Sequence, residues 1–257
     1  MTDSVSSLFD LHNRTAVITG SSSGIGHAIA GFLAEAGARV VLVARRKDRL
    51  HALVESIQAN GGQAAAVDGD LGEIAGIADI AERCEQAFGD VHILVNAAGV
   101  NLRQPADAVT PEKWNQTIQL NLSAPFFFAQ ALVPGMRKTG YGRIINIASL
   151  QSVRAFPDGI AYGASKGGVC QLTRAMAEAW SPNGITCNAI APGFFPTELT
   201  GPIFESSERR NWAANQTAMG RNGELEDLAG ISVFLASPAS GYITGQTIFV
   251  DGGFTAK

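Results

Sequence analysis

The stretch TAVITGSSSGIG (residues 15–26) decides the fold expected for this chain. Its first five residues are mostly apolar or β-branched, and they predict a buried β-strand. The glycines that follow permit a tight turn and a close approach of the backbone to a ligand. The last residues open an amphipathic helix, whose free N–H groups and positive dipole end suit a diphosphate. A flexible Gly/Ser loop is the alternative, but strand, glycine loop and helix in this order indicate a dinucleotide site.

Strand-like runs and helical patterns alternate along the rest of the chain. Further strands are expected at residues 40–44, 64–67, 92–96, 143–148, 184–191 and 247–250, and helices near residues 25–36, 46–60, 72–88, 111–138, 162–181 and 224–236. This alternation predicts the α/β class, a Rossmann-like doubly wound sheet, mostly parallel, with helices on both faces. Because no linker interrupts the pattern, we expect residues 1–257 to form a single domain. The least regular stretch, residues 193–220, is a candidate lid or binding loop.

Composition excludes several classes of protein. The chain has 257 residues, 46% of them hydrophobic and 16% charged, which is typical of a globular protein with a sizeable core. A formal net charge of −4 and the lack of any basic run argue against a nucleic-acid partner. No apolar stretch approaches the ~20 residues of a membrane span, and the first thirteen residues lack a secretory pattern. We therefore expect a cytoplasmic protein that binds neither membranes nor nucleic acids.

The cysteines indicate a reducing compartment. Cys84, Cys170 and Cys187 are widely spaced, odd in number and form no CxxC pair. A disulfide framework or a zinc site is therefore disfavoured. We expect three reduced thiols in the core and no bound metal.

Two arginines at the end of the second predicted strand favour NADP over NAD. In doubly wound dinucleotide folds, an acidic residue at this place holds the ribose 2′-hydroxyl of NAD. Here Ala44 stands there, followed by Arg45 and Arg46. Arginine suits a 2′-phosphate, through bidentate and charge-assisted contacts. The alternative is that these arginines are solvated charges at the start of a helix.

Two further segments are expected beside the cofactor. Asp70 and Leu71 follow the third predicted strand, where a carboxylate would lie near the adenine amino group. Asp68 competes for that role, and either aspartate is also a candidate helix cap. The segment NAAG (residues 96–99) closes the fourth predicted strand, and its small residues let the backbone lie against the cofactor.

A tyrosine and a lysine suggest acid–base chemistry. In YGASK (residues 162–166), Tyr162 and Lys166 are four residues apart and so share one face of a helix that begins near Tyr162. A tyrosine with a pKa near ~10 is a poor acid or base at neutral pH, and a neighbouring ammonium lowers that pKa. The alternative is a packing tyrosine beside a solvated lysine.

Two other polar residues extend this group. Ser149 ends the preceding strand and is placed to hydrogen-bond a substrate oxygen, with Ser152 as its rival and a turn cap as the alternative role. Asn121 is polar within an apolar helical pattern, so it needs a partner. That partner is either a backbone carbonyl or a water molecule that passes protons through Lys166.

Together and in this order, these motifs resemble the short-chain dehydrogenase/reductase family. The matching pieces are TGSSSGIG (19–26), NAAG (96–99), Asn121, Ser149, YGASK (162–166), PGFFPT (192–197) and VDGG (250–253). The resemblance covers essentially the whole chain and implies an NADP(H)-dependent oxidoreductase that interconverts a carbonyl and a secondary alcohol. It implies that Tyr162 donates the proton in reduction and that Lys166 lowers its pKa and binds the nicotinamide ribose. It further implies that Ser149 orients the substrate oxygen, that Asn121 completes a proton relay, and that the chain forms a homotetramer through its long helices.

The resemblance completes the cofactor site, because it implies that Pro192, Gly193 and Thr197 line the nicotinamide and diphosphate. The predicted cofactor-binding residues are then Gly20, Ser22, Ser23, Gly24, Ile25, Gly26, Arg45, Arg46, Asp70, Leu71, Asn96, Ala97, Gly99, Pro192, Gly193 and Thr197. The chain departs from the family pattern at Ala97, where asparagine is usual. It also has Ser23 where many NADP-dependent members carry a basic residue, so Arg45 and Arg46 must carry the phosphate preference.

The substrate is less well defined by the sequence. IASLQS (147–152), KGGVCQLTRAMAEAW (166–180) and PGFFPTELTGP (192–202) resemble the gluconate 5-dehydrogenase branch of the family, which implies the pair 5-keto-gluconate and gluconate. The candidate substrate-binding residues are Arg103, Leu150, Arg154 and Phe194. The two arginines would pair with a sugar-acid carboxylate, unless they are solvated surface charges.

Two alternatives remain open. Leu150, Phe156, Phe194 and Phe195 would give an apolar wall, which suits a broad-specificity ketone reductase or a 3-oxoacyl-type reductase better than a sugar-acid enzyme. A non-catalytic dinucleotide-binding sensor is the alternative from another class. The retention of all the expected catalytic residues argues against it.

Overall fold

The computed structural model describes residues 4–257 and contains one seven-stranded sheet, in the order β3-β2-β1-β4-β5-β6-β7. The strands are β1 (Thr15–Thr19), β2 (Arg39–Ala44), β3 (Gln63–Asp68), β4 (Ile93–Asn96), β5 (Gly142–Ile147), β6 (Ile185–Pro192) and β7 (Thr247–Val250). All neighbouring strands pair in parallel. The predicted α/β class with a Rossmann-like doubly wound sheet is therefore confirmed. The strand order reverses at β1, between β2 and β4, and open α/β sheets bind ligands beyond the carboxyl ends of the strands at such a point.

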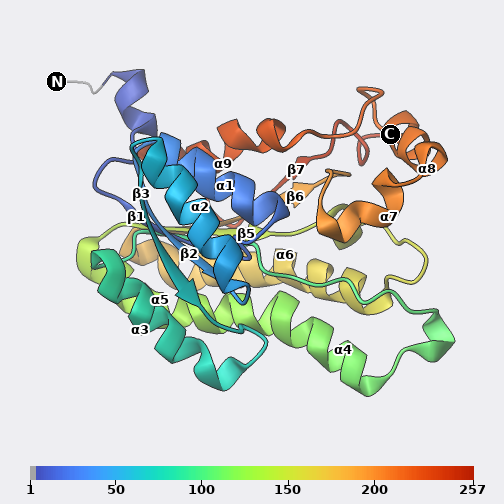
Figure 1. Cartoon of the computed structure of the whole chain (residues 1–257), viewed down its shortest axis with the longest axis horizontal. Helices are drawn as coiled ribbons and strands as arrows, with labels where there is room; N and C mark the ends of the chain where they lie inside the picture. Colours follow the sequence, from blue (N-terminus) through green and yellow to red (C-terminus); the bar gives the residue numbers. More distant parts are fainter. Residues whose placement is uncertain (1–3) are drawn as a thin grey trace.

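Helices cover both faces of the sheet, with α1, α2 and α9 on one side and α3, α4, α5 and α6 on the other (Figure 1). The helices are α1 (Gly24–Glu35), α2 (Lys47–Ala59), α3 (Ile77–Phe88), α4 (Pro111–Ile118), α5 (Ala124–Thr139), α6 (Ile160–Trp180), α7 (Gly201–Phe204), α8 (Ser207–Gln216) and α9 (Ala229–Ala236). Short 3₁₀ turns are η1 (Val5–Phe9), η2 (Ile74–Gly76), η3 (Ala106–Ala108), η5 (Leu150–Ser152), η6 (Ser181–Asn183), η7 (Glu198–Thr200), η8 (Leu225–Leu228) and η9 (Pro238–Ser240).

The apolar strands contribute side chains to two separate hydrophobic cores, one on each face of the sheet. On β1, Ile18 packs with Ile29 of α1 in one core, whereas its neighbour Val17 packs with Phe128 of α5 in the other. Successive side chains of a strand point to opposite faces, so a strand covered on both faces must be apolar at every position. This explains why the strands read as continuous apolar runs in the sequence.

The structure differs from the sequence-based expectation in several helical regions. In the helix predicted over residues 224–236, Leu225–Leu228 form the 3₁₀ turn η8 and α9 begins only at Ala229. The helix predicted over residues 111–138 is divided by a π-helical turn, η4 (Gln119–Ser123), which separates α4 from α5. Residues 193–220, predicted to be irregular, contain α7 and α8 at one end of the molecule (Figure 1). Helix α6 begins at Ile160, two residues before Tyr162. Prolines and charges hide the short helices, because the apolar period needs several turns to become visible.

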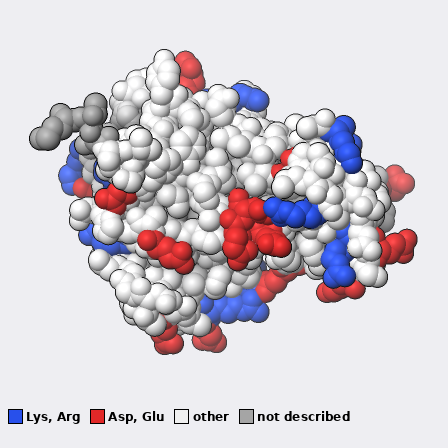
Figure 2. All heavy atoms as spheres, turned by 90° about the horizontal axis from the view of Figure 1, so that it is seen from above, with Lys and Arg blue, Asp and Glu red and all other residues white. Residues whose placement is uncertain are grey.

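The surface of the molecule is that of an ordinary globular protein. On the face shown in Figure 2, small groups of acidic and basic side chains alternate with uncharged surface. Cys84, Cys170 and Cys187 are buried free thiols. Within residues 4–257, no helix has the length and apolar character that crossing a membrane requires, and no cluster of residues suits a metal ion.

Candidate active site

A cleft of about 390 Å³ lies at the carboxyl ends of the strands, beside the reversal of strand order. Most of the predicted site residues line it: Gly20, Ser22, Ser23, Gly24, Ile25, Gly26, Arg45, Arg46, Asp70, Leu71, Ala97, Gly99, Ser149, Tyr162, Lys166, Pro192 and Thr197. The structure thus brings together residues from all parts of the sequence. The volume is within the range of small-molecule sites.

The glycine loop packs against the end of β4 so closely that larger side chains do not fit. A Cβ on Gly20, whose φ is +67°, would lie 2.8 Å from the Ala97 carbonyl oxygen. A Cβ on Gly26 would lie 2.7 Å from the Gly20 carbonyl oxygen. Thr19, the last residue of β1, supports this contact between the glycine loop and the end of β4. Its Oγ1 accepts hydrogen bonds of 3.0 Å from the backbone N–H groups of Ala97 and Ala98. The role of Thr19 was not predicted from the sequence.

The start of α1 is suited to an anion. Ser23 is the N-cap residue of α1, yet its side chain makes no capping hydrogen bond to the helix. Free N–H groups at a helix start attract negative charge. The glycine loop, whose glycines have no side chains to cover the backbone, and the uncapped start of α1 together fit the diphosphate of a dinucleotide.

Two of the predicted cofactor residues lie behind the cleft and do not line it. Asn96 is buried, and its Nδ2 donates to Asn146 Oδ1 (2.9 Å) and to the Pro125 carbonyl (3.3 Å). Gly193 donates its N–H to the Val250 carbonyl at 2.9 Å. Both residues therefore join neighbouring elements of the fold that supports the site.

Tyr162 and Lys166 are both buried at the start of α6, with side-chain positions that the surrounding backbone holds. Lys166 Nζ lies 5.7 Å from the centre of the Tyr162 ring and donates a 2.6 Å hydrogen bond to the Ile147 carbonyl at the end of β5. Burial lowers the pKa of Lys166 to about 8, because a charged ammonium loses its hydration there. The tyrosine and the lysine therefore share one face of α6, as the spacing predicted.

The pKa of Tyr162 is shifted in the direction opposite to the one expected from its lysine neighbour. Burial raises this pKa, and the effect outweighs a hydrogen bond with Ser149 and the charge of Arg103, both of which lower it. Tyr162 is therefore neutral at physiological pH. A neutral phenol is the form that donates a proton.

Ser149 and Ser152 have different roles. Ser149 faces the cleft, and its Oγ accepts a 3.1 Å hydrogen bond from the Gln151 N–H. Ser152 Oγ donates instead to the Lys166 carbonyl at 2.9 Å, which ties η5 to α6. Of these two serines, Ser149 lines the cleft together with Tyr162, whereas Ser152 binds the backbone of α6 and does not line the cleft.

Asn121 lies in the π-helical turn and binds backbone. Its Nδ2 donates to the Val100 carbonyl (2.9 Å) and to Ser165 Oγ (3.1 Å), and its Oδ1 accepts from the Val100 N–H (2.8 Å). Ser165 Oγ in turn donates to the Tyr162 carbonyl at 2.7 Å. The backbone carbonyl expected as one of two partners is therefore present, and Asn121 connects the end of β4 to the first turns of α6.

The two arginines after β2 have different surroundings. Arg46 donates from Nη2 to Ser22 Oγ (2.9 Å) and Ser23 Oγ (2.6 Å), both in the glycine loop. Arg45 instead pairs with Asp70, with its Nη1 3.3 Å from Asp70 Oδ2. Because Arg45 and Asp70 line the cleft whereas Asp68 pairs with Arg83, Asp70 is the aspartate that reaches the site.

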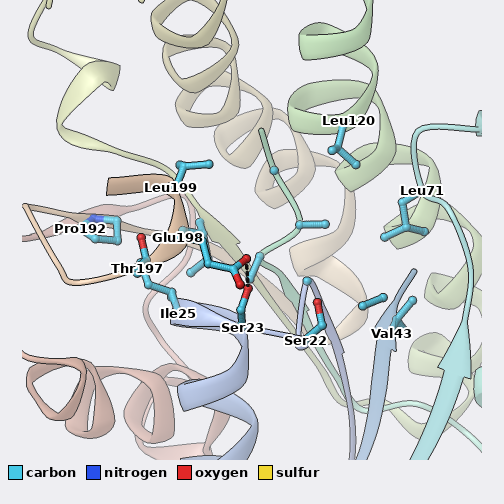
Figure 3. Close-up of a pocket in the computed structure, with 18 of the residues that line it drawn as sticks. Ser22, Ser23, Ile25, Val43, Leu71, Leu120, Pro192, Thr197, Glu198 and Leu199 are labelled. Atoms are coloured by element: carbon cyan, nitrogen blue, oxygen red, sulfur yellow. Dashed lines mark hydrogen bonds between the residues drawn. The ribbon is translucent and has the colours of Figure 1, made fainter. Parts of the chain in front are cut away.

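Glu198 is a site residue that the sequence did not reveal. It begins η7, after β6, and points toward Ser23 of the glycine loop, to which it is hydrogen-bonded (Figure 3). It also pairs with Arg46, the residue before α2, and with Arg49 of α2. Leu199 follows it in the lining of the cleft. No local pattern distinguishes a glutamate in this segment from any exposed glutamate, because its partners are more than a hundred residues away in the chain.

The four predicted substrate residues lie in different surroundings. Arg103 is exposed, donates to the Leu199 carbonyl (3.4 Å) and is close enough to Tyr162 to lower its pKa. Leu150 is buried, and Arg154 stacks on Phe254 with its guanidinium 5.8 Å from the ring centre. None of Arg103, Leu150, Arg154 and Phe194 lines the cleft. Phe194 packs edge-on against the rings of Phe156, Phe254 and Trp212. Its neighbour Phe195 does line the cleft.

Comparison with known proteins agrees with this architecture. A family model described as enoyl-(acyl carrier protein) reductase matches residues 20–255. Gluconate 5-dehydrogenase of Gluconobacter oxydans is 38% identical over 250 residues, which are 97% of this chain and 98% of the relative. A crystal structure of gluconate 5-dehydrogenase from Burkholderia cenocepacia in complex with NADP and tartrate has a TM-score of 0.95, with 39% identity over 99% of this chain and 100% of the other. A short-chain type dehydrogenase/reductase from Mycobacterium marinum has a TM-score of 0.92, with 34% identity over 99% and 100% of the two chains. As its motifs predicted, this chain belongs to the short-chain dehydrogenase/reductase family.

Proposed function

We propose that this protein is an NADP(H)-dependent oxidoreductase that interconverts a carbonyl and a secondary alcohol, with 5-keto-gluconate and gluconate as the pair. One observation carries the proposal: a buried, protonated tyrosine faces the same cleft as a glycine loop shaped for a diphosphate. The resemblance to gluconate 5-dehydrogenases supports the substrate.

The residues of the cleft fit a phosphorylated dinucleotide. The glycine loop and the start of α1 would hold its diphosphate, Ser22, Ser23 and Arg46 its 2′-phosphate, and Asp70 its adenine. When bound, the dinucleotide supplies hydride in reduction and accepts it in oxidation. NADP in the related Burkholderia structure supports the choice of the phosphorylated form.

In reduction, the hydroxyl of Tyr162 donates its proton to the substrate oxygen as that oxygen gains charge. Ser149 Oγ donates a hydrogen bond to the same oxygen and holds it near the tyrosine. Lys166 is charged below its pKa of about 8, and this charge stabilises the phenolate that remains. In oxidation the proton moves in the opposite direction. Asn121 acts as a positioning residue, because its bonds reach Tyr162 only through Ser165 and the backbone.

The direct test measures the loss of NADPH absorbance with 5-keto-D-gluconate and with a panel of ketones that includes a 3-oxoacyl thioester. We expect turnover of the sugar acid, and we expect Arg103→Ala to raise its KM by roughly tenfold through the lost carboxylate contact. Arg154→Ala is the matched control, because Arg154 stacks on Phe254 whereas Arg103 lies close enough to Tyr162 to lower its pKa, and its KM stays within twofold of wild type. Reduction of other ketones alone would disprove the substrate, and no NADPH oxidation with any carbonyl would disprove the activity.

A broad-specificity ketone or 3-oxoacyl-type reductase is the second candidate. It is favoured by Leu120, Phe195 and Leu199, which give the cleft an apolar lining. A 3-oxoacyl (acyl-carrier-protein) reductase from Agrobacterium tumefaciens is also similar, with a TM-score of 0.92 and 33% identity over 98% of each chain. The same panel separates the two candidates.

We further propose a single-domain chain that assembles into a homotetramer in the cytoplasm. Trp114 of α4 and Phe127 of α5 are exposed on the helices expected to form contacts. The three free thiols suit a reducing compartment. Light scattering on the purified protein is expected to give the mass of four chains of 26.9 kDa each, and a monomeric mass would contradict the tetramer.

A further inference from the structure

Glu198 is a charged residue of the cleft to which the proposed reaction gives no role. It belongs to the segment after β6, yet its carboxylate lies beside Ser23 of the glycine loop (Figure 3). It also pairs with Arg46, just before α2, and with Arg49 of α2. Oε2 accepts from Ser23 Oγ (3.0 Å) and Arg46 Nη1 (2.9 Å), and Oε1 pairs with Arg49. The glutamate therefore links the segment after β6 to the glycine loop and to the start of α2.

The groups around this carboxylate form an anion site. Hydrogen bonds from Arg49, Arg46 and Ser23 hold the pKa of Glu198 at about 2, so the group is ionised throughout the pH range of an assay. Two guanidinium groups and a hydroxyl at one point are also the donors that bind phosphate in proteins. The same Arg46 and Ser23 are those proposed above for the 2′-phosphate of NADP.

Two anions cannot share these donors, because like charges at contact distance repel strongly. The ion pairs of Glu198 with Arg46 and Arg49 can also be replaced by pairs with another anion. The side chains of Arg46, Arg49 and Glu198 are 42%, 52% and 54% exposed, and ion pairs of such exposure contribute little to stability. A phosphate dianion is a stronger partner for two arginines than a carboxylate.

We infer that Glu198 occupies the subsite of the cofactor 2′-phosphate and competes with it, and that Arg49 is a further residue of this subsite. The inference rests on the proposed use of NADP(H). It makes Glu198 a specificity residue: its carboxylate lowers the affinity only for ligands that carry a 2′-phosphate. The side chain of Glu198 must leave Arg46 and Arg49 when such a ligand binds.

The test compares binding of adenosine 2′,5′-bisphosphate, which carries the 2′-phosphate, with binding of 5′-AMP, which lacks it. Titration calorimetry on the full-length protein gives both dissociation constants. For Glu198→Gln we expect the bisphosphate to bind about fivefold more tightly and 5′-AMP to change by less than twofold. For Arg49→Ala we expect the bisphosphate alone to bind about fivefold more weakly. Glu205→Gln, a neutralised glutamate just after α7, is the matched control and is expected to change neither ligand.

Hydrogen exchange gives a second readout that does not depend on affinity. The Thr200 N–H donates to the Thr197 carbonyl in the turn that carries Glu198. We expect the bisphosphate to speed exchange in the peptide that spans residues 197–204, because the carboxylate loses its anchor, and 5′-AMP to leave it unchanged.

The outcomes separate the two proposals. If wild type binds the bisphosphate no more tightly than 5′-AMP, the use of NADP(H) is wrong and this inference is wrong with it. If wild type prefers the bisphosphate but Glu198→Gln leaves its affinity unchanged or lowers it, only the inference is wrong. Equal tightening of both ligands would also overturn it, because the effect would not belong to the 2′-phosphate.

Discussion

The two ends of the cleft are built in opposite ways. At the catalytic end, Tyr162 and Lys166 are 8% and 5% exposed, and the lysine is held by a backbone carbonyl at the end of β5. At the end proposed to hold the 2′-phosphate, Arg46, Arg49 and Glu198 are half exposed and are held mainly by one another. One end is fixed by the sheet and α6, whereas the other depends on side chains that water reaches.

This difference separates chemistry from affinity. Burial shifts the pKa values of Tyr162 and Lys166 away from their ordinary values, and it fixes one geometry for proton transfer. Charges at the exposed end are screened by solvent, so they exchange partners with small changes in free energy. Substitutions at the buried end should therefore change rate or stability strongly, and those at the exposed end should change ligand preference mildly.

Tyr162→Phe should produce the largest effect, because it removes the proton donor and keeps the ring that fills the buried site. We expect kcat for carbonyl reduction to fall by about 10²–10⁴. The measurement is NADPH oxidation at saturating substrate, with NADPH affinity and Tm as controls that stay near wild type. A variant with the wild-type rate would break the comparison, since the buried end would then carry no chemistry.

Lys166→Met tests the burial of charge through the pH dependence of stability. The pKa of Lys166 falls from 10.5 to about 8 on folding, so between these values the unfolded chain binds more protons and stability rises with pH. We expect urea unfolding to show that the stability of wild type relative to Lys166→Met increases by roughly 2–3 kcal/mol from pH 7 to pH 10. Lys113→Met, on the exposed side of α4, controls for loss of a lysine far from the cleft. A constant difference across this range would show that the lysine is not held charged and buried.

Gly26→Ala and Gly31→Ala form a matched pair within α1. A Cβ on Gly26 meets the backbone of Gly20 at 2.7 Å, whereas a Cβ on Gly31 meets nothing within 4 Å. We expect the first change to lower the free energy of unfolding by about 1–3 kcal/mol and to weaken NADPH binding. The second should raise stability by about 0.5–1 kcal/mol, because alanine favours helix. Equal effects in thermal unfolding would contradict the close contact between the start of α1 and the glycine loop.

The fold and the buried end could be predicted from the sequence for a physical reason. Strands covered on both faces must be apolar throughout, and the expected strand at residues 15–19 matches β1 residue for residue. The spacing of Tyr162 and Lys166 is a local property of one helix, so their shared face follows from helical geometry alone. Ser149 was separable from Ser152 only in three dimensions, because both are serines in the same turn.

The exposed end could not be predicted in the same way. Glu198 meets its partners through a contact between distant segments, and its surroundings in the sequence are those of an ordinary loop. Asn121 could be picked out as a polar residue in an apolar pattern, but the π-helical turn that carries it could not, since its extra residue breaks the helical period. Asn96 was predicted beside the cofactor and instead binds Asn146 across neighbouring strands, because the direction of a side chain at a strand end depends on register.

The smallest effect is expected at Arg45, and it sharpens the contrast between two adjacent arginines that the sequence could not separate. The side chain of Arg45 is 68% exposed and makes one 3.3 Å contact with Asp70, whereas Arg46 binds Ser22 and Ser23 of the glycine loop. We expect Arg45→Ala to weaken NADPH binding by less than about threefold, and Arg46→Ala by roughly tenfold or more, in titrations that follow NADPH fluorescence. NADH is the control ligand and should distinguish the variants little, because it lacks the 2′-phosphate. If Arg45→Ala loses as much affinity as Arg46→Ala, the phosphate lies between both arginines and the anion site is wider than the contacts of Glu198 indicate.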